Sequence, residues 1–429
     1  MMRFRNFLYI PLSLLALFFG CDKTGPEDPV DFPAGDFYDL LLELGVDVNG
    51  DGAISYAEAE NVTVLMISNR VLFDLKGIEH LVNLESLWCQ NCQLSTIPDL
   101  SKNTMLKDLD CSENELRYLD VSNLIHLQNL NCSMNQIETI DLRECLDLRN
   151  LDCNTNQIGS LDISSCDQLE HINCHDNQIA ILDLSACSRL RTFNCQRNGI
   201  EELDLAGKQY LYDVNCNENQ LARLDVSNNS TLDYLQCGGN MLTELDLTNC
   251  GSLRHVWCPG NLLTQLDLSD QVNLYMLDCD NNQLQQLDVS DKEQLWTLDC
   301  DHNQLSTLEV SNNPELIAIE CGWNQLTSLD LSRLYSLHRL ECGVNQLTDL
   351  DVTDLAELYV LNCRGNLLNS LDLSYNFGLG SRDYECDLDI GDMPSLTEVC
   401  VWIMPFPPEE LTLCSEGSPN VYFTTTCSN

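Results

Sequence analysis

The sequence predicts an elongated solenoid of about fifteen stacked coils, built mainly from short β-strands with short or irregular return segments. Three observations support this fold class. Cysteine recurs from Cys111 to Cys363 at a constant interval of 21 residues, after a first step of 22 residues from Cys89. A large apolar residue stands two positions before each of these cysteines, and asparagine stands three positions after each one from Asn114 to Asn366. A repeat that keeps one register over so many units stacks each coil on the next.

The N-terminus predicts export. Arg3 and Arg5 precede an apolar run over residues 8–19, which is too short for a confident membrane span. Gly20 and Cys21 follow, and this segment resembles the lipobox of bacterial lipoproteins. The resemblance implies that residues 1–20 are a signal peptide, that Cys21 is lipidated, and that the lipid anchor is the only membrane contact. The implied location is the bacterial cell envelope, at the outer membrane, with surface exposure left open. An uncleaved signal anchor is the alternative.

Residues 21–35 contain Pro26, Pro29 and Pro33, and this composition predicts an extended, proline-rich tether.

A calcium-loop motif lies in the segment 36–61, which we expect to form a small helical N-terminal cap. Residues 47–58 match the pattern D-x-[DN]-x-[DN]-G-x5-E at every required position. Calcium binds about seven hard oxygen ligands. The expected ligands are Asp47, Asn49, Asp51, Ala53 through its carbonyl, Ser55 and Glu58. The motif resembles an EF-hand or dockerin-type loop, and a single loop of this kind predicts a structural calcium ion. The alternative is an acidic turn without metal.

The repeat unit begins at residue 62 and continues to about residue 380. Residues 106–116 read Leu-x-x-Leu-x-Cys-x-x-Asn-x-Leu, and a half-size copy of the pattern follows within each 21-residue unit. The unit resembles the leucine-rich repeat, in the nested form found in bacterial cell-surface proteins and similar in logic to internalins. Leu109 and Cys111 alternate with Asp110, as expected for a strand with one buried face. The stacked Asn amides are expected to bind loop backbone groups that would otherwise be buried without partners.

The cysteine column has two interpretations. Exported proteins usually oxidise their cysteines, but buried thiols behave as small apolar side chains, and parallel strands in register place their side chains alongside one another. We favour a mostly reduced, packed column. Cys92 occupies the Asn column, so Cys89 and Cys92 are interpreted as repeat positions rather than as a redox or zinc pair.

A second column holds aspartate from Asp120 to Asp372, with Glu309 replacing one member. The expectation is that these carboxylates accept hydrogen bonds from nearby backbone or hydroxyl groups, as Asp120 would from Ser122. Calcium binding along the column is the alternative.

Residues 381–429 are expected to form a C-terminal cap. Four cysteines there lie outside the repeat register and are candidates for disulfides: Cys386, Cys400, Cys414 and Cys427.

Composition limits the function. With 67 acidic and 21 basic residues the net charge is −46, which excludes nucleic-acid binding and suits calcium, a basic protein or a neutral glycan. No nucleophile elbow, phosphate-binding glycine loop or HExxH motif is present, so no enzymatic activity is expected.

Aromatic residues appear beside the strands from the middle of the array onward, and they are the candidate partner-binding residues: Tyr212, Tyr234, Trp257, Tyr275, Trp296, Trp323 and Tyr359. Exposed aromatics with acidic neighbours suit protein hot spots or sugar stacking. The sequence therefore predicts a non-catalytic lipoprotein that binds a macromolecule, most readily a protein, in adhesion or protein–protein interaction. The alternatives are a glycan-binding lipoprotein of a nutrient-uptake system, or rings that only cover one another.

Overall fold

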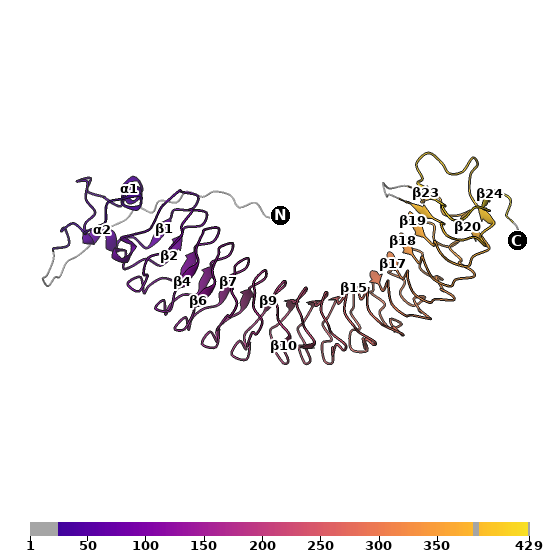
Figure 1. Ribbon diagram of the computed structural model, residues 1–429, viewed down its shortest axis with the longest axis horizontal. Coiled ribbons are helices and arrows are strands. Elements are labelled where there is room, and N and C mark those ends of the chain that lie inside the picture. The colour runs from indigo at the N-terminus through magenta and orange to yellow at the C-terminus, as the bar shows by residue number, and fades with distance from the viewer. Residues whose placement is uncertain (1–24, 381–385, 428–429) are drawn as a thin grey trace.

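The computed structural model describes residues 25–380 and 386–427, and the chain forms an arc of stacked coils (Figure 1). The N-terminal helices lie at one end of the arc and the C-terminal strands lie at the other. Among the described residues, no helix is long and apolar enough to cross a membrane.

One parallel sheet of 17 strands runs along the whole array. Its strands β15, β17 and β18 follow the inner edge of the arc in Figure 1, and we call this surface the concave face. The strands of this sheet are β1 (Val64–Met66), β2 (Ser86–Trp88), β3 (Asp108–Asp110), β5 (Asn129–Asn131), β7 (Asn150–Asp152), β8 (His171–Asn173), β9 (Thr192–Asn194), β11 (Asp213–Asn215), β13 (Tyr234–Gln236), β14 (His255–Trp257), β15 (Met276–Asp278), β16 (Thr297–Asp299), β17 (Ala318–Glu320), β18 (Arg339–Glu341), β19 (Val360–Asn362), β21 (Leu388–Asp389) and β23 (Leu413–Cys414).

The first fifteen of these strands belong to the predicted repeat, so the solenoid fold and its coil count are confirmed. Strands β21 and β23 come from the C-terminal segment, which extends the solenoid by two further coils.

The return segments are short and mostly irregular. The strands outside the long sheet form small parallel groups, and β10 lies on the outer side of the arc (Figure 1). These strands are β4 (Tyr118–Asp120), β6 (Thr139–Asp141), β10 (Glu202–Asp204), β12 (Arg223–Asp225), β20 (Ser370–Asp372), β22 (Glu398–Cys400) and β24 (Tyr422–Thr424).

The core is a stack of leucine and cysteine side chains between the two sides of each coil. In β3 the middle residue Leu109 is buried while Asp108 and Asp110 are partly exposed, and the same alternation recurs in most strands of the long sheet. Every cysteine of the column from Cys89 to Cys363 is a fully buried free thiol. Burial raises the pKa of these thiols, to about 12 for Cys216, which keeps them neutral and unreactive.

The asparagine column closes the turns after the strands. Asn261 Nδ2 donates to the carbonyl oxygens of Cys258 (3.1 Å) in its own coil and Cys237 (3.0 Å) in the preceding coil. Its Oδ1 accepts from the backbone N–H of Leu242 at 3.0 Å. The same bonds recur along the array, so the predicted role of this column is confirmed.

A comparable column lies in the second half of each unit. Asn229 Nδ2 donates to the carbonyls of Leu205 (2.9 Å) and Val226 (2.8 Å). Lys208 occupies the same column, and its buried Nζ donates to Leu184 O at 2.9 Å. A lysine is accepted in this interior because its amino group supplies donors for the carbonyls of the coil before it.

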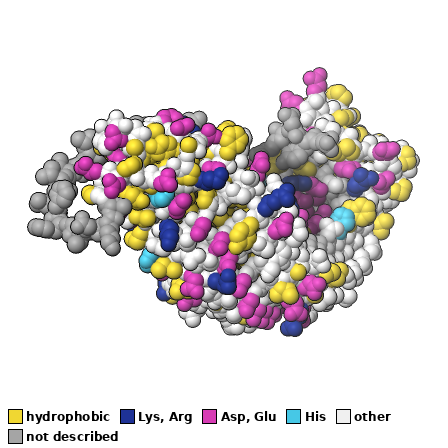
Figure 2. Space-filling model, turned by 60° about the vertical axis from the view of Figure 1, so that its left-hand side comes forward, with side chains coloured by type: hydrophobic (Ala, Val, Ile, Leu, Met, Phe, Trp, Pro, Cys, Tyr) yellow, Lys and Arg dark blue, Asp and Glu magenta, His cyan; other side chains and the backbone are white. Residues whose placement is uncertain are grey.

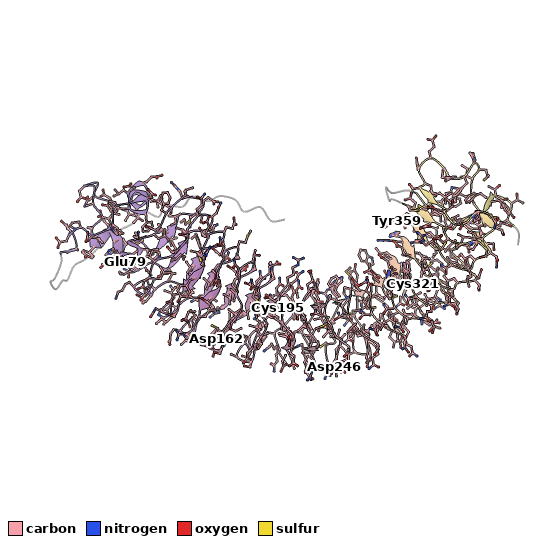
Figure 3. The ribbon with its side chains drawn as sticks, in the orientation of Figure 1. Glu79, Asp162, Cys195, Asp246, Cys321 and Tyr359 are labelled. Carbon is pink, nitrogen blue, oxygen red and sulfur yellow. A yellow bond between two sulfur atoms is a disulfide. The ribbon has the colours of Figure 1, made fainter. Side chains whose placement is uncertain are left out.

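The aspartate column is satisfied by local hydrogen bonds. Asp120 Oδ1 accepts from Ser122 N (3.0 Å) and Ser122 Oγ (2.7 Å), as expected. The side-chain hydrogen bond from Ser164 is the main cause of a lowered pKa at Asp162, so this carboxylate is charged at neutral pH. Asp162 and Asp246 lie on the outer side of the arc (Figure 3).

The N-terminal cap consists of α1 (Asp36–Glu43) and α2 (Tyr56–Glu60), and a short 3-10 helix, η1 (Ile78–His80), follows in the first repeat coils. Part of the predicted tether belongs to this cap. Val30 is buried, and its N–H donates to Ile54 O at 2.8 Å, while Pro29 forms a β-bridge with Ser55. The expectation of an extended tether to residue 35 is therefore wrong from about residue 26, because the carbonyl of Pro26 accepts from Ala57 N, and Val30 and Phe32 then complete the core of the cap.

Candidate functional site

The concave face has two halves of different chemistry. In the first half, strands β3 to β11 present asparagine, aspartate, threonine and histidine side chains that line a groove of about 780 Å³. These side chains bind one another across coils: Asn173 Nδ2 donates to Asp152 Oδ2 at 3.2 Å, and His171 Nδ1 lies 2.7 Å from Thr192 Oγ1. This half is a polar trough of amides and carboxylates.

The second half carries aromatic stacks. Tyr234 stacks on His255 with ring centroids 4.1 Å apart, and His255 stacks on Trp257 at 5.5 Å. His255 also meets Tyr275 edge-on at 5.8 Å, and Tyr275 stacks on Trp296 at 5.3 Å. These five rings form one continuous cluster over strands β13 to β16, which we call the aromatic cluster.

Other predicted aromatics lie apart from this cluster. Trp323 stacks on His302 at 5.2 Å in the turn after the strands, where its backbone φ is 49° and its exposed fraction is 55%. Tyr359 stacks on His338 at 5.4 Å, at the inner edge of the arc (Figure 3). Tyr212 is exposed and shares no ring contact among the described residues. The structure thus brings four of the seven candidates together: Tyr234, Trp257, Tyr275 and Trp296.

His255 is the central residue of the aromatic cluster, although it is not among the seven aromatic candidates predicted from the sequence. It is 8% exposed, and desolvation lowers its pKa, so the ring is neutral at pH 7. Its position in the strand, two residues before Trp257, is the signal that could have placed it between the tyrosine and tryptophan rings.

An acidic cluster adjoins the aromatic cluster on strands β15 to β18. Carboxylate oxygens of Asp299, Asp301 and Glu320 lie within 4.8 Å of one another. Burial is the main cause of the raised pKa values of Asp299, to about 8, and Asp301, to about 7, and the charge of Glu320 adds to both. The sequence predicted acidic neighbours for the aromatic residues, but it gave no indication of Asp301, which enters the cluster from the turn after β16.

Basic side chains on this face are already paired. Arg254 binds Asp233, and Arg339 lies between Glu320 and Glu341. Among the described residues, no lysine or arginine forms an ion pair with Asp278, Asp299 or Asp301. Figure 2 shows acidic side chains over much of the visible surface and few basic ones.

The predicted calcium loop joins α1 to α2. Asp47 accepts hydrogen bonds from the N–H groups of Gly50 (2.7 Å) and Gly52 (2.9 Å), both of which have positive φ. Asn49 Oδ1 accepts from Asp51 N, and Asp51 Oδ1 accepts from Ala53 N. The side chains of the first half of the loop therefore turn inward, toward the loop's own backbone.

Glu58 reaches back across this loop. Its Oε1 accepts from the N–H groups of Val48 (2.8 Å) and Asn49 (3.1 Å), and its Oε2 accepts from Ser55 N and Oγ. The backbone N–H of Ser55 is the main cause of its lowered pKa. The expected ligands share one loop, but the carboxylates of Asp47, Asp51 and Glu58 do not all lie within 4.8 Å of one another in this structure.

The cysteines outside the repeat array lie at the two ends of the chain. Cys21 lies outside the described residues. In the C-terminal segment Cys386 pairs with Cys414, and Cys400 pairs with Cys427, as disulfides. The first bond joins the last two coils of the long sheet, and the second joins β22 to the segment after β24.

Comparison with solved structures agrees with this geometry. The functional domain of InlJ from Listeria monocytogenes, described as including a cysteine ladder, is 28% identical, with a TM-score of 0.66 over 86% of this chain and 78% of that chain. The chain folds as a leucine-rich-repeat solenoid. A leucine-rich-repeat protein of Leptospira interrogans (20% identity, TM-score 0.54, 82% and 93% of the two chains) shares the fold. So does the plant peptide hormone receptor RGFR1 in complex with RGF2 (18%, 0.60, 86% and 73%). No protein-family model matches the chain, and no curated protein matches its sequence.

Proposed function

We propose that this chain is a non-catalytic, lipid-anchored protein of the bacterial cell envelope that binds a protein partner through its concave face, in adhesion or another protein–protein interaction. The observation that carries the proposal is the aromatic cluster, five rings in continuous contact beside unpaired carboxylates. Clustered aromatic side chains are typical of the energetic centres of protein interfaces. The RGFR1 structure supports the proposal, because that solenoid of the same fold is in complex with RGF2.

The lipid anchor remains a proposal based on residues 1–21, and it can be tested separately. Mass spectrometry of the full-length protein from a bacterial host should find an acylated Cys21 as the first residue. An unmodified Cys21 in a chain that still begins at Met1 would contradict it.

The partner-binding test compares two triple variants of the full chain. The change Trp257→Ala, Trp296→Ala and Trp323→Ala removes two partly buried indoles of the aromatic cluster and the exposed indole of Trp323. We expect partner affinity to fall at least about 100-fold, because aromatic residues at the energetic centre of an interface contribute about 2 kcal/mol or more each. The measurement is binding to arrays of purified proteins and of glycans, followed by titration of the hit. The matched control removes three exposed tyrosines outside the long sheet, Tyr118→Ala, Tyr335→Ala and Tyr375→Ala. Equal affinity of the partner for the two triple variants would exclude these tryptophans as partner-binding residues.

A glycan is the second candidate ligand, and the polar trough favours it. Amide and carboxylate groups on successive coils, with Trp88 at one end, are suited to hydrogen bonding and stacking with sugar rings. In this case the glycan array gives the hit, and binding is lost on changing the trough rather than the aromatic cluster. Asn131→Ala with Asn173→Ala tests that outcome.

We propose further that the α1–α2 loop binds calcium as a structural ion. The loop already directs Asp47, Asn49 and Asp51 inward and brings Glu58 to its first residues. Bound calcium would hold the two ends of the loop together and so stabilise the cap against unfolding.

The expected result is a rise in the thermal midpoint of the cap on adding calcium to metal-free protein, because a ligand that binds only the folded state stabilises it. Calorimetry with and without calcium measures this shift. Asp47→Ala with Glu58→Ala should abolish the shift, whereas Glu27→Ala with Asp31→Ala, which removes two exposed carboxylates outside the loop, should retain it. The same shift in both double variants would refute the calcium site.

A further inference from the structure

A notch beside the aromatic cluster opens at the edge of the concave face. Its volume is about 440 Å³, and it lies between the turns after β11, β13 and β14. Its lining residues are Asn217, Glu218, Gln236, Gly239, Trp257 and Asp278, together with Gly238 and Pro259. The space exists because two consecutive coils have glycine where other coils carry a side chain. Gly239 has a φ of 63° and holds the repeat position that is Glu218 one coil earlier and Asn281 two coils later.

One wall of the notch is a tryptophan held in a fixed orientation. His255 stacks on Trp257 with an angle of 12° between the two ring planes, and Tyr234 stacks on His255 in turn. Because burial lowers the pKa of His255, the ring behind Trp257 is neutral and does not repel a cation. A rigid indole with a neutral stacking partner is suited to a planar cation.

The notch also offers two carboxylates, Glu218 from the turn after β11 and Asp278 from the strand next to Trp257. Glu218 is already bound by Arg197, with Nε at 3.0 Å from Oε2. Asp278 is partly buried and accepts a hydrogen bond from the N–H of Asp280 at 3.2 Å, but no ion pair involves it among the described residues. Desolvation is the main cause of the raised pKa of Asp278, to about 6, and a cation placed beside it would lower that pKa again.

A row of carboxylates leads away from the notch. The parallel register places Asp278 beside Asp299, and Asp299 beside Glu320, on strands β15, β16 and β17. Neighbouring strands are about 4.8 Å apart, so the row creates a negative field that begins at the notch and extends over the acidic cluster.

We propose that the notch beside Trp257 anchors an arginine side chain of the protein partner, and that the adjoining carboxylate row selects a partner segment rich in positive charge. This inference rests on the proposed function and names the chemistry of the partner. The guanidinium stacks on the indole and donates to Asp278, a combination that lysine satisfies less well because its ammonium group is not planar. At the rim, Asn217 Oδ1 already accepts from Gly238 N at 2.6 Å, and Gln236 Oε1 accepts from Asn217 Nδ2 at 3.3 Å, so Asp278 is the principal acceptor for the guanidinium.

The test uses the full chain and a fluorescein-labelled peptide of three Gly-Arg units, with a second peptide in which citrulline replaces each arginine. Citrulline keeps the planar shape and loses the charge. Fluorescence anisotropy should show at least about tenfold tighter binding of the arginine peptide. Because a chain of charge −46 attracts any polycation, this comparison is made together with notch variants.

The notch variants are Trp257→Ala and Gly239→Asn. The second fills the notch without demanding a new backbone conformation, because Asn91 and Asn281 occupy this turn position with positive φ in other coils. Each variant should weaken the arginine peptide about fivefold or more. The matched controls are Gly365→Asn, at the same repeat position with the same φ of 63°, and Tyr335→Ala, an exposed aromatic outside the long sheet. Both controls should bind like the unmodified chain.

Two results would overturn the inference: equal binding of the arginine and citrulline peptides, or arginine binding that Trp257→Ala and Gly239→Asn leave at the level of the controls. The second result would mean that the overall charge holds the peptide. Failure of the arginine anchor can be distinguished from failure of the proposed function, because the triple tryptophan variant is tested against the protein partner found on the array. If that variant loses the hit while the peptides show no preference, only the arginine anchor is wrong.

Discussion

At the scale of single residues, Asn261 shows how a buried amide stabilises the turn of each coil. Its side chain binds three backbone carbonyls, those of Cys237, Cys258 and Pro259, and one backbone N–H, that of Leu242. The amide is 4% exposed, so water cannot replace these partners. Each buried polar group left without a partner costs roughly 1–3 kcal/mol. One asparagine per coil therefore makes the tight turn possible, and the cysteine beside it only fills space.

Asn261→Leu keeps the approximate volume and removes all of these bonds. We expect a loss of about 3 kcal/mol or more in the free energy of unfolding, because several backbone groups become unpaired in the interior. Urea unfolding followed by circular dichroism measures the change. Asn123→Ala, at an exposed position whose side chain contacts only Ser122, is the control and should alter stability by less than about 0.5 kcal/mol. A similar loss in both variants would contradict the assigned role.

The roles of repeated residues were predictable from the sequence because each is repeated in every coil. Asn114 to Asn366, the buried cysteines and the Asp120–Ser122 pair all behave as the period indicates. The environment of Asp301 was not predictable, because its burial depends on side chains from two neighbouring coils and on how closely the curved sheet brings them together. His255 was missed for a related reason: its place in the strand puts it on the same face as Trp257, but its stacking with Tyr234 depends on the neighbouring coil.

At the scale of elements, strands β15 to β18 place acidic side chains at equivalent positions of neighbouring coils. Asp278, Asp299 and Glu320 occupy one row, and the turn residues Asp280 and Asp301 lie beside them. Glu341 and Arg339 on β18 complete the surroundings, with Arg339 paired to Glu320 and Glu341. The raised pKa values of Asp278, Asp299 and Asp301 mean that ionising these groups costs more in the folded chain than in the unfolded chain.

This arrangement predicts an unusual dependence of stability on pH. Because the folded pKa values are raised from 3.8 to about 6, 7 and 8, the folded state binds more protons than the unfolded state between about pH 4 and pH 8. Stability from these groups is fully present below about pH 4 and is lost as the pH rises through the folded values. The thermal midpoint of the C-terminal coils should therefore rise when the pH falls from about 8.5 to about 5.5.

Isosteric variants separate this effect from the general negative charge. Asp299→Asn with Asp301→Asn should be more stable than the unmodified chain at pH 8.5 and should show a flatter midpoint between pH 8.5 and 5.5. Asp162→Asn with Asp183→Asn is the control, because the pKa values of these two carboxylates are lowered and they stay ionised throughout that range. A slope that is unchanged in the first variant, or flattened equally in both, would show that the cluster is not its source.

At the scale of the whole molecule, the outer side and the concave face of the arc differ in the chemistry of their side chains. The outer side carries an aspartate column, including Asp162 and Asp246 in Figure 3, which is satisfied by its own serine and threonine partners. The concave face carries the trough, the aromatic cluster and the unpaired acids. The coil number followed from the period, but the extent of the caps did not. Residues 26–32 pack on the N-terminal cap, and residues 386–427 add coils, because apolar residues there complete a core although the repeat pattern is absent.

The central claim, that a protein partner binds over the aromatic cluster, is tested most directly by hydroxyl-radical footprinting of the full chain with and without the partner found on the array. The account predicts reduced oxidation of Tyr234, Trp257, Tyr275 and Trp296 in the complex, with Tyr118 and Tyr335 unchanged. Protection of the outer tyrosines, while the aromatic cluster stays as reactive as in the free chain, would contradict it.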